Sequence, residues 1–124
     1  MNAERGPRDE ITLARLRDQL RTFATARDWN QFHSPKNLAI ALSVEAGELL
    51  EHFQWISDKD SLALRPNKLG EVKEEMADVL LYLIRLADIL NVELVQAADK
   101  KIKANARKYP VEKSRGSSKK YTDL

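Results

Sequence analysis

The sequence predicts an all-α fold, a four-helix bundle assembled as an oligomer, on three observations. Only four glycines and four prolines occur in 124 residues, so turn-forming residues are few. Apolar residues recur every three or four positions along four segments, which is the period of a helix with one buried face. No segment alternates apolar and polar residues as a half-buried strand does.

The first helix is expected at about residues 9–27, after a flexible leader of residues 1–8. Its apolar side chains recur at helical spacing along one face. Asp9 and Glu10 suit the positive N-terminal end of a helix. This helix is therefore predicted to be amphipathic, with its apolar face toward the bundle.

The second helix is expected at about residues 35–55. The apolar period breaks before it, and Ser34 followed by Pro35 is a favourable helix start, with serine as the N-cap and proline at the first helical position. Glu45 and Glu48 interrupt the apolar stripe of this helix instead of lying opposite to it. Two carboxylates are therefore predicted on a face that should be buried.

The third helix is expected at about residues 67–90, after a polar loop. Its predicted core face consists of Val72, Met76, Val79, Leu80, Leu83, Ala87 and Leu90. An adjoining polar row contains Glu75 and Asp78, which repeat the three-residue spacing of the first acidic pair, and continues through Tyr82 and Arg85. This helix is therefore predicted to bring a second acidic pair to the core.

The fourth helix is expected at about residues 92–109, because Pro110 cannot continue it. Its predicted buried face is Leu94, Val95, Ala98, Ile102 and Tyr109. We expect a single helical domain over residues 1–110. Residues 111–124 form a basic tail, which is either disordered or ordered by docking at the active site or on a neighbouring subunit.

The apolar residues of the second and third helices extend beyond one face of each helix. The additional positions are Ile40, Val44, Leu50, Leu81, Leu86 and Ile89. Four helices of one chain cannot bury all of these side chains. We therefore expect the helices to pair across subunits, in a dimer or a tetramer.

Composition excludes several classes of protein. Without cysteine, neither a disulfide framework nor a cysteine-ligated zinc site is possible. The N-terminal stretch MNAERGPRDEI lacks the apolar core of a signal peptide, and no apolar run is long enough for a membrane span. A cytoplasmic protein without a membrane partner is therefore expected. Residues 1–98 carry 12 basic against 16 acidic side chains, and residues 99–120 carry nine against two. This asymmetry indicates either an anionic ligand, such as a phosphate chain, or simply a solvated charged surface.

The two acidic pairs together predict a metal site. One such pair is more typical of a solvated helix face, but here two pairs lie among apolar residues, where carboxylates without a cation would repel each other and resist burial. Oxygen ligands favour Mg²⁺, with Mn²⁺ as a substitute. The third helix has no histidine, which disfavours a di-iron centre.

Aromatic and amide side chains near the acidic pairs suggest a ligand with a flat ring. Trp29, Phe32 and Trp55 are candidates to stack on it, and Asn30, Gln31 and His33 are candidates to read its edge. Tyr82, one turn beyond Asp78, can reach a sugar or a phosphate. The alternative is that these residues anchor the core or an interface.

Three stretches resemble the MazG-like all-α nucleoside triphosphate pyrophosphatases, and more narrowly their dCTP pyrophosphatase branch. These stretches are RDWNQFHSPKNLAIALSVEAGELLEHFQW, EEMADVLLYLIRLA and KYPVEKSRGSSKKYTDL. The resemblance covers about residues 12–124. It implies hydrolysis between the α and β phosphates of a nucleoside triphosphate, and a homotetramer with sites between subunits.

The resemblance also implies roles for individual residues. Glu45, Glu48, Glu75 and Asp78 match the Mg²⁺ ligands of the family, and the stretch from Trp29 to His33 is implied at the nucleotide together with Trp55, Tyr82 and Asn105. Either Glu45 or Glu48 is our candidate catalytic base, and Lys36, Arg115 and Lys119 are candidate phosphate contacts.

One departure from the family leaves the substrate open. Animal members carry a histidine nine residues before the tryptophan of the WxQFH stretch, where this chain has Leu20. Candidate substrates are dCTP, 5-substituted dCTP and other triphosphates. The rival hypothesis is a non-catalytic helical module that binds nucleotides or nucleic acid. Nucleic acid is disfavoured because acidic residues dominate the body of the chain and the basic end has few aromatic residues.

Overall fold

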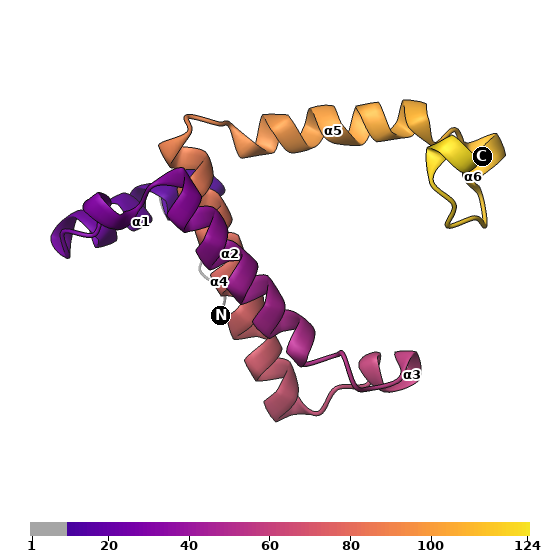
Figure 1. The fold of residues 1–124 in the computed structure, drawn as a ribbon, viewed down its shortest axis with the longest axis horizontal. Helices are drawn as coiled ribbons and strands as arrows, with labels where there is room; N and C mark the ends of the chain where they lie inside the picture. The colour runs from indigo at the N-terminus through magenta and orange to yellow at the C-terminus, as the bar shows by residue number, and fades with distance from the viewer. Residues whose placement is uncertain (1–9) are drawn as a thin grey trace. The chain divides into compact units, whose positions relative to one another are not determined.

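The computed structural model describes residues 10–124, in which every regular element is a helix (Figure 1). The chain divides into two compact units, one ending at Asn91 and the other spanning Val92–Leu124. We describe each unit by itself. The predicted leader and Asp9 lie outside the described residues. Within residues 10–124, no helix combines the length and the apolar character that a membrane span requires.

The first unit is built on the packing of α2 and α1 against the long helix α4. Its elements in chain order are α1 (Leu13–Ala26), η1 (Asn30–Phe32), α2 (Pro35–Glu51), α3 (Asp58–Ser61) and α4 (Pro66–Ile89). Figure 1 shows α2 and α4 running side by side along most of the length of α2. This pairing brings the two predicted acidic helices together.

Hydroxyl side chains start three of these helices. Thr12, Ser34 and Ser57 each accept a hydrogen bond from the backbone N–H three residues later, which satisfies one of the donors that a helix N-terminus leaves free. The predicted start of the second helix at Ser34 and Pro35 is confirmed. The cap at Thr12 also explains why α1 begins later than the residue 9 that we predicted.

The prediction that the second helix continues to residue 55 was wrong. Its last helical residue is Glu51, and turn hydrogen bonds from the N–H groups of Phe53 and Gln54 to the carbonyl of Leu50 close it. Trp55 is 87% exposed, so no burial holds it in a further helical turn. The loop that follows was predicted without structure and contains the short helix α3.

The core of the first unit is small. Its buried apolar side chains are Ala24, Leu38, Val72, Ile84 and Ala87. The predicted core face of the third helix is therefore only partly correct, because Met76 is 57% exposed and Leu80, Leu83 and Leu90 are also exposed. Only α1 and α2 pack extensively against α4 in this unit, and two helices do not provide enough surface to cover α4 on all sides.

The second unit contains α5 (Leu94–Lys108), α6 (Val111–Ser114) and η2 (Tyr121–Asp123). The tail is thus ordered into two short helices, and the Tyr121 ring meets Tyr109 edge-on at a centroid distance of 5.9 Å. The predicted buried face of the fourth helix is not covered, because Val95 and Ile102 are 62% and 69% exposed.

Candidate functional site

Three of the four predicted metal ligands converge between α2 and α4. Glu45, Glu48 and Glu75 each offer one carboxylate oxygen, and these oxygens lie within 4.8 Å of one another. One oxygen of Glu45 and one of Glu75 are buried and have no hydrogen-bond partner among the described residues. Ionised carboxylates are acceptors only, so nothing in the cluster itself can satisfy them. These residues fit a hard divalent cation, which prefers oxygen ligands.

The crowding of the carboxylates changes the proton affinity of Glu45. Its pKa is raised to about 7, mainly because a proton shared with Glu75 makes a hydrogen bond that the ionised pair cannot make. Burial and the neighbouring Glu48 raise this pKa further. In the absence of a cation, the cluster therefore relieves its repulsion by taking up a proton near neutral pH.

Asp78 occupies a different place from the other three carboxylates. It lies one turn after Glu75 on α4 and adds to the negative field at Glu45, but it lines a neighbouring pocket. Asp78 thus links the cluster to the pocket.

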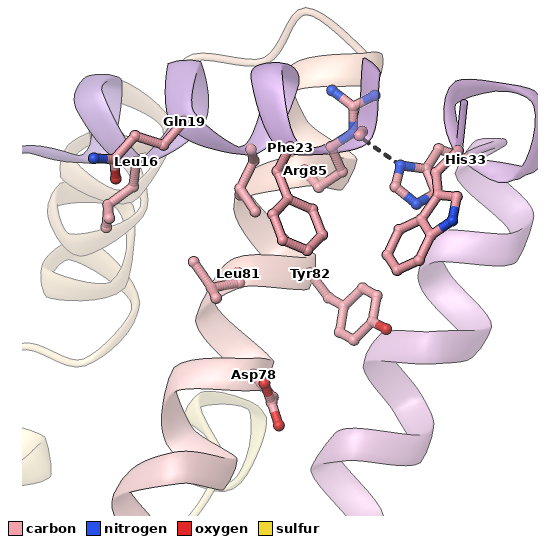
Figure 2. A pocket seen from close by; sticks show the side chains of 11 residues that line it. Leu16, Gln19, Phe23, His33, Asp78, Leu81, Tyr82 and Arg85 are labelled. Atoms are coloured by element: carbon pink, nitrogen blue, oxygen red, sulfur yellow. Dashed lines mark hydrogen bonds between the residues drawn. The ribbon is translucent and has the colours of Figure 1, made fainter. Parts of the chain in front are cut away.

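This pocket has a volume of about 430 Å³ and lies between α1, the loop after it and α4 (Figure 2). Its apolar side is formed by Leu16, Leu20, Phe23 and Leu81, and the other side carries Trp29, His33, Asp78 and Tyr82. The Trp29 ring meets Phe23 and His33 edge-on at centroid distances of 5.6 and 6.3 Å. Both the size and the mixed lining suit a small molecule with an aromatic ring and a charged end.

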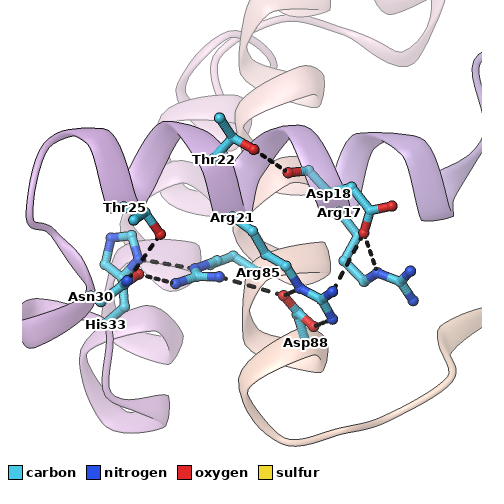
Figure 3. A network of polar contacts seen from close by, with 9 residues as sticks. All are labelled: Arg17, Asp18, Arg21, Thr22, Thr25, Asn30, His33, Arg85 and Asp88. Atoms are coloured by element: carbon cyan, nitrogen blue, oxygen red, sulfur yellow. Dashed lines mark hydrogen bonds and ion pairs between the residues drawn. The ribbon is translucent and has the colours of Figure 1, made fainter.

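A polar network adjoins this pocket and is centred on Arg85, which is itself one of the residues that line the pocket (Figure 3). Its guanidinium donates to His33 Nδ1 at 3.1 Å and to Asn30 Oδ1 at 2.7 Å, and it contacts Asp88 Oδ2 at 3.4 Å. Asp88 also accepts two hydrogen bonds from Arg21, which lower its pKa below the usual value although burial acts in the opposite direction. The network connects α1, the loop and α4.

The side-chain amides of Asn30 and Gln31, which were predicted to contact the edge of a ligand ring, form hydrogen bonds within the chain. The Asn30 amide donates to Thr25 and accepts from Arg85, and the Gln31 amide nitrogen donates to Asp28. The function of these amides within one chain is therefore to hold the loop. Their predicted contact with a ligand stays a prediction.

The remaining predicted residues do not meet at this pocket in the first unit. Phe32 is 59% exposed, and Lys36 and Trp55 are also exposed outside the pocket lining. Asn105, Arg115 and Lys119 belong to the second unit. Their roles at a ligand stay predictions.

The sequence pattern predicted Arg85 on the polar row of the third helix but indicated no function for it. It is 6% exposed, and it is the buried charged residue among residues 10–124. A sequence signal existed, because an arginine set between Ile84 and Leu86 must find partners if that face is buried. The partner His33 lies 52 positions away, and no local pattern indicates such a contact.

Comparisons with known proteins identify a family and several relatives of this chain. The profile of the MazG-like family matches residues 40–124. The chain is 48% identical to dCTP pyrophosphatase 1 of Mus musculus and 44% identical to that of Homo sapiens, in each case over 93% of this chain and 69% of the relative.

A solved structure is also similar. A pyrophosphatase from Archaeoglobus fulgidus superposes with a TM-score of 0.76 at 42% identity, covering 82% of this chain and 94% of the other. The match to the family profile includes Glu45, Glu48, Glu75 and Asp78. The chain therefore belongs to the MazG-like family.

Proposed function

We propose that this protein is a divalent-metal-dependent nucleoside triphosphate pyrophosphohydrolase that converts dCTP, or a 5-substituted dCTP, and water to the monophosphate and pyrophosphate. The observation that carries the proposal is the carboxylate cluster beside the aromatic pocket, joined through Asp78. The similarity to relatives named dCTP pyrophosphatase 1 supports the choice of nucleotide. A role in removing unwanted nucleotides from the pool follows from this chemistry.

In this proposal Glu45, Glu48, Glu75 and Asp78 hold Mg²⁺, for which Mn²⁺ can substitute. The cation supplies positive charge that neutralises the phosphates when it is bound. The two orphaned carboxylate oxygens support this assignment, because a cation satisfies acceptors that have no donor.

The chemical step needs a base, and both candidates belong to the proposed metal ligands. Glu45 or Glu48 accepts a proton from a water molecule as the water oxygen bonds to the α-phosphorus. The bond from that phosphorus to the oxygen bridging to the β-phosphate breaks, and pyrophosphate leaves with this oxygen.

Substrate choice is tested with a panel of triphosphates under identical conditions with Mg²⁺. We expect dCTP or its 5-substituted forms to have the highest kcat/KM, measured by pyrophosphate release. Leu20 lines the pocket, so its apolar side chain contributes to the preference for base or sugar. Absence of cleavage of every triphosphate, combined with DNA binding that weakens steeply with salt, would support the nucleic-acid-binding module instead.

The proposal includes a homotetramer whose sites lie between subunits. Exposed apolar side chains on α2 support it, since Ile40, Val44 and Leu50 are all more than half exposed in one chain. The exposed Trp55 is then available to close the nucleotide site of a neighbouring subunit.

Sedimentation equilibrium tests this assembly. We expect the mass of a tetramer, or of a dimer as the smaller alternative, at micromolar concentration. Val44→Glu should shift the protein toward smaller species because a charge cannot be buried there without a partner. Glu51→Lys, an exchange at an exposed polar position of the same helix, is the control. A wild-type monomer would contradict this part of the proposal.

A further inference from the structure

The contact between Arg85 and His33 determines which nitrogen of the imidazole carries a proton. A guanidinium has only N–H donors, so the Nδ1 atom that lies 3.1 Å from Arg85 Nε must be the acceptor. A neutral imidazole then carries its hydrogen on Nε2. Burial, together with the charge of Arg85, also opposes a second proton, and the pKa of His33 lies below the usual value of 6.5.

Arg85 is itself held in a fixed orientation. Asn30 Oδ1 accepts from one terminal nitrogen at 2.7 Å, and Asp88 faces the other. Asp88 has a side chain only 9% exposed and is held by Arg21 Nε at 2.7 Å, so it cannot swing away with Arg85 (Figure 3). A planar guanidinium held on both sides has little freedom to turn its Nε–H from His33.

The other ring nitrogen of His33 is available to a ligand. His33 lines the 430 Å³ pocket beside Trp29 and Tyr82 (Figure 2). Within residues 10–124, its Nε2 atom has no hydrogen-bond partner. The pocket lining therefore includes the Nε2–H donor of His33 next to its aromatic side chains.

We propose that Arg85 is a positioning residue that holds His33 as a neutral Nε2–H donor, so that the pocket selects a base with a hydrogen-bond acceptor at its edge. The inference rests on the proposed function, because it names a determinant of base recognition in the same pocket. A base with an N–H donor at that position is rejected, since two facing donors leave both groups unpaired. Arg85 itself lines the pocket, and the double-mutant cycle separates its effect through His33 from a direct contact with the ligand.

The protonation site is measured directly in the free protein. Imidazole ¹⁵N–¹H correlation spectra at pH 7 should show His33 as a single Nε2–H tautomer, with the resonances of the second histidine identified from a His52→Gln variant. Arg85→Met should give a mixture of tautomers and a higher His33 pKa. The control Arg17→Met removes an arginine of α1 that pairs with Asp18 and stands outside the contacts that hold Arg85, so it should keep the wild-type tautomer.

A double-mutant cycle measures whether Arg85 acts through His33. We expect Arg85→Met to raise the KM for dCTP about tenfold, the loss of one well-oriented hydrogen bond, with a much smaller change in kcat. In a His33→Phe background the same substitution should change KM less than about twofold, because the group that Arg85 positions is already absent.

Several outcomes overturn the inference. A wild-type His33 in the Nδ1–H or the doubly protonated form does so whether or not any variant folds. An unchanged tautomer in Arg85→Met overturns it as well. An equal loss of the tautomer in the control Arg17→Met, or an additive effect on KM in the cycle, also overturns it. If the wild-type protein cleaves no triphosphate, the proposed function fails, and the spectra still decide the tautomer.

Discussion

Replacing Glu45 with glutamine is expected to reduce kcat/KM for dCTP by about a thousandfold, a loss of about 4 kcal/mol of transition-state stabilisation. The variant keeps the size of the side chain and removes its charge. One buried acceptor that faces Glu75 is then lost, and so is a candidate base. Both the affinity for Mg²⁺ and the chemical step should suffer, because phosphoryl transfer depends on charge neutralisation at the phosphates.

The measurement is pyrophosphate release at saturating Mg²⁺, with Mg²⁺ affinity determined by calorimetry. Glu74→Gln is the matched control, because Glu74 adjoins Glu75 on α4 but is exposed and stands outside the carboxylate cluster. We expect the control to retain wild-type activity. Full activity and unchanged Mg²⁺ affinity in Glu45→Gln would mean that the cluster is not the metal site.

The second large effect is on the stability of the metal-free protein. The pKa of Glu45 is about 7 in the folded protein against an ordinary value of 4.5. The folded state therefore binds a proton that the unfolded state has already released, and stability that is fully present below pH 4.5 is lost as pH rises through 7. Relative to wild type, Glu45→Gln should become progressively more stable over this range.

The difference in stability between wild type and Glu45→Gln isolates the contribution of Glu45 to the pH dependence. His33 has a lowered pKa and contributes in the opposite direction as pH falls below 6.5, but it is present in both proteins. Asp88 also has a lowered pKa, and its stabilisation is lost only as pH falls below 3.8. Urea unfolding in the presence of a chelator, at a series of pH values from 4.5 to 8, gives the difference in the free energy of unfolding.

Adding Mg²⁺ should restore the stability that the wild-type protein loses as pH rises through 7. At a concentration of 100 times its Kd, a ligand that binds only the folded state adds about 2.7 kcal/mol to the free energy of unfolding. Glu45→Gln should gain much less than this at the same Mg²⁺ concentration. A stability difference between the two proteins that is independent of pH, or an equal Mg²⁺ effect on both, would contradict the shared-proton cluster.

Local rules were sufficient for much of the fold. The cap at Ser34 with Pro35 places the start of α2 correctly, because both residues act within one helical turn. The spacing of Glu45 and Glu48 places both on one helix face for the same reason. Where the sequence pattern ran past the end of a helix, as at Trp55, the residue lacked the burial that would have continued it.

By itself, the sequence determined that the chain is helical, where most of its helices lie, and that two acidic pairs interrupt apolar faces, because each of these properties depends on neighbours within a few positions. Only the tertiary structure decided that Glu75 joins Glu45 and Glu48 more closely than Asp78 does, and that Arg85 reaches His33. These contacts join distant parts of the chain. The pairing of side chains between helices depends on how α1 and α2 pack against α4. The periodicity of apolar residues along the sequence does not determine that packing.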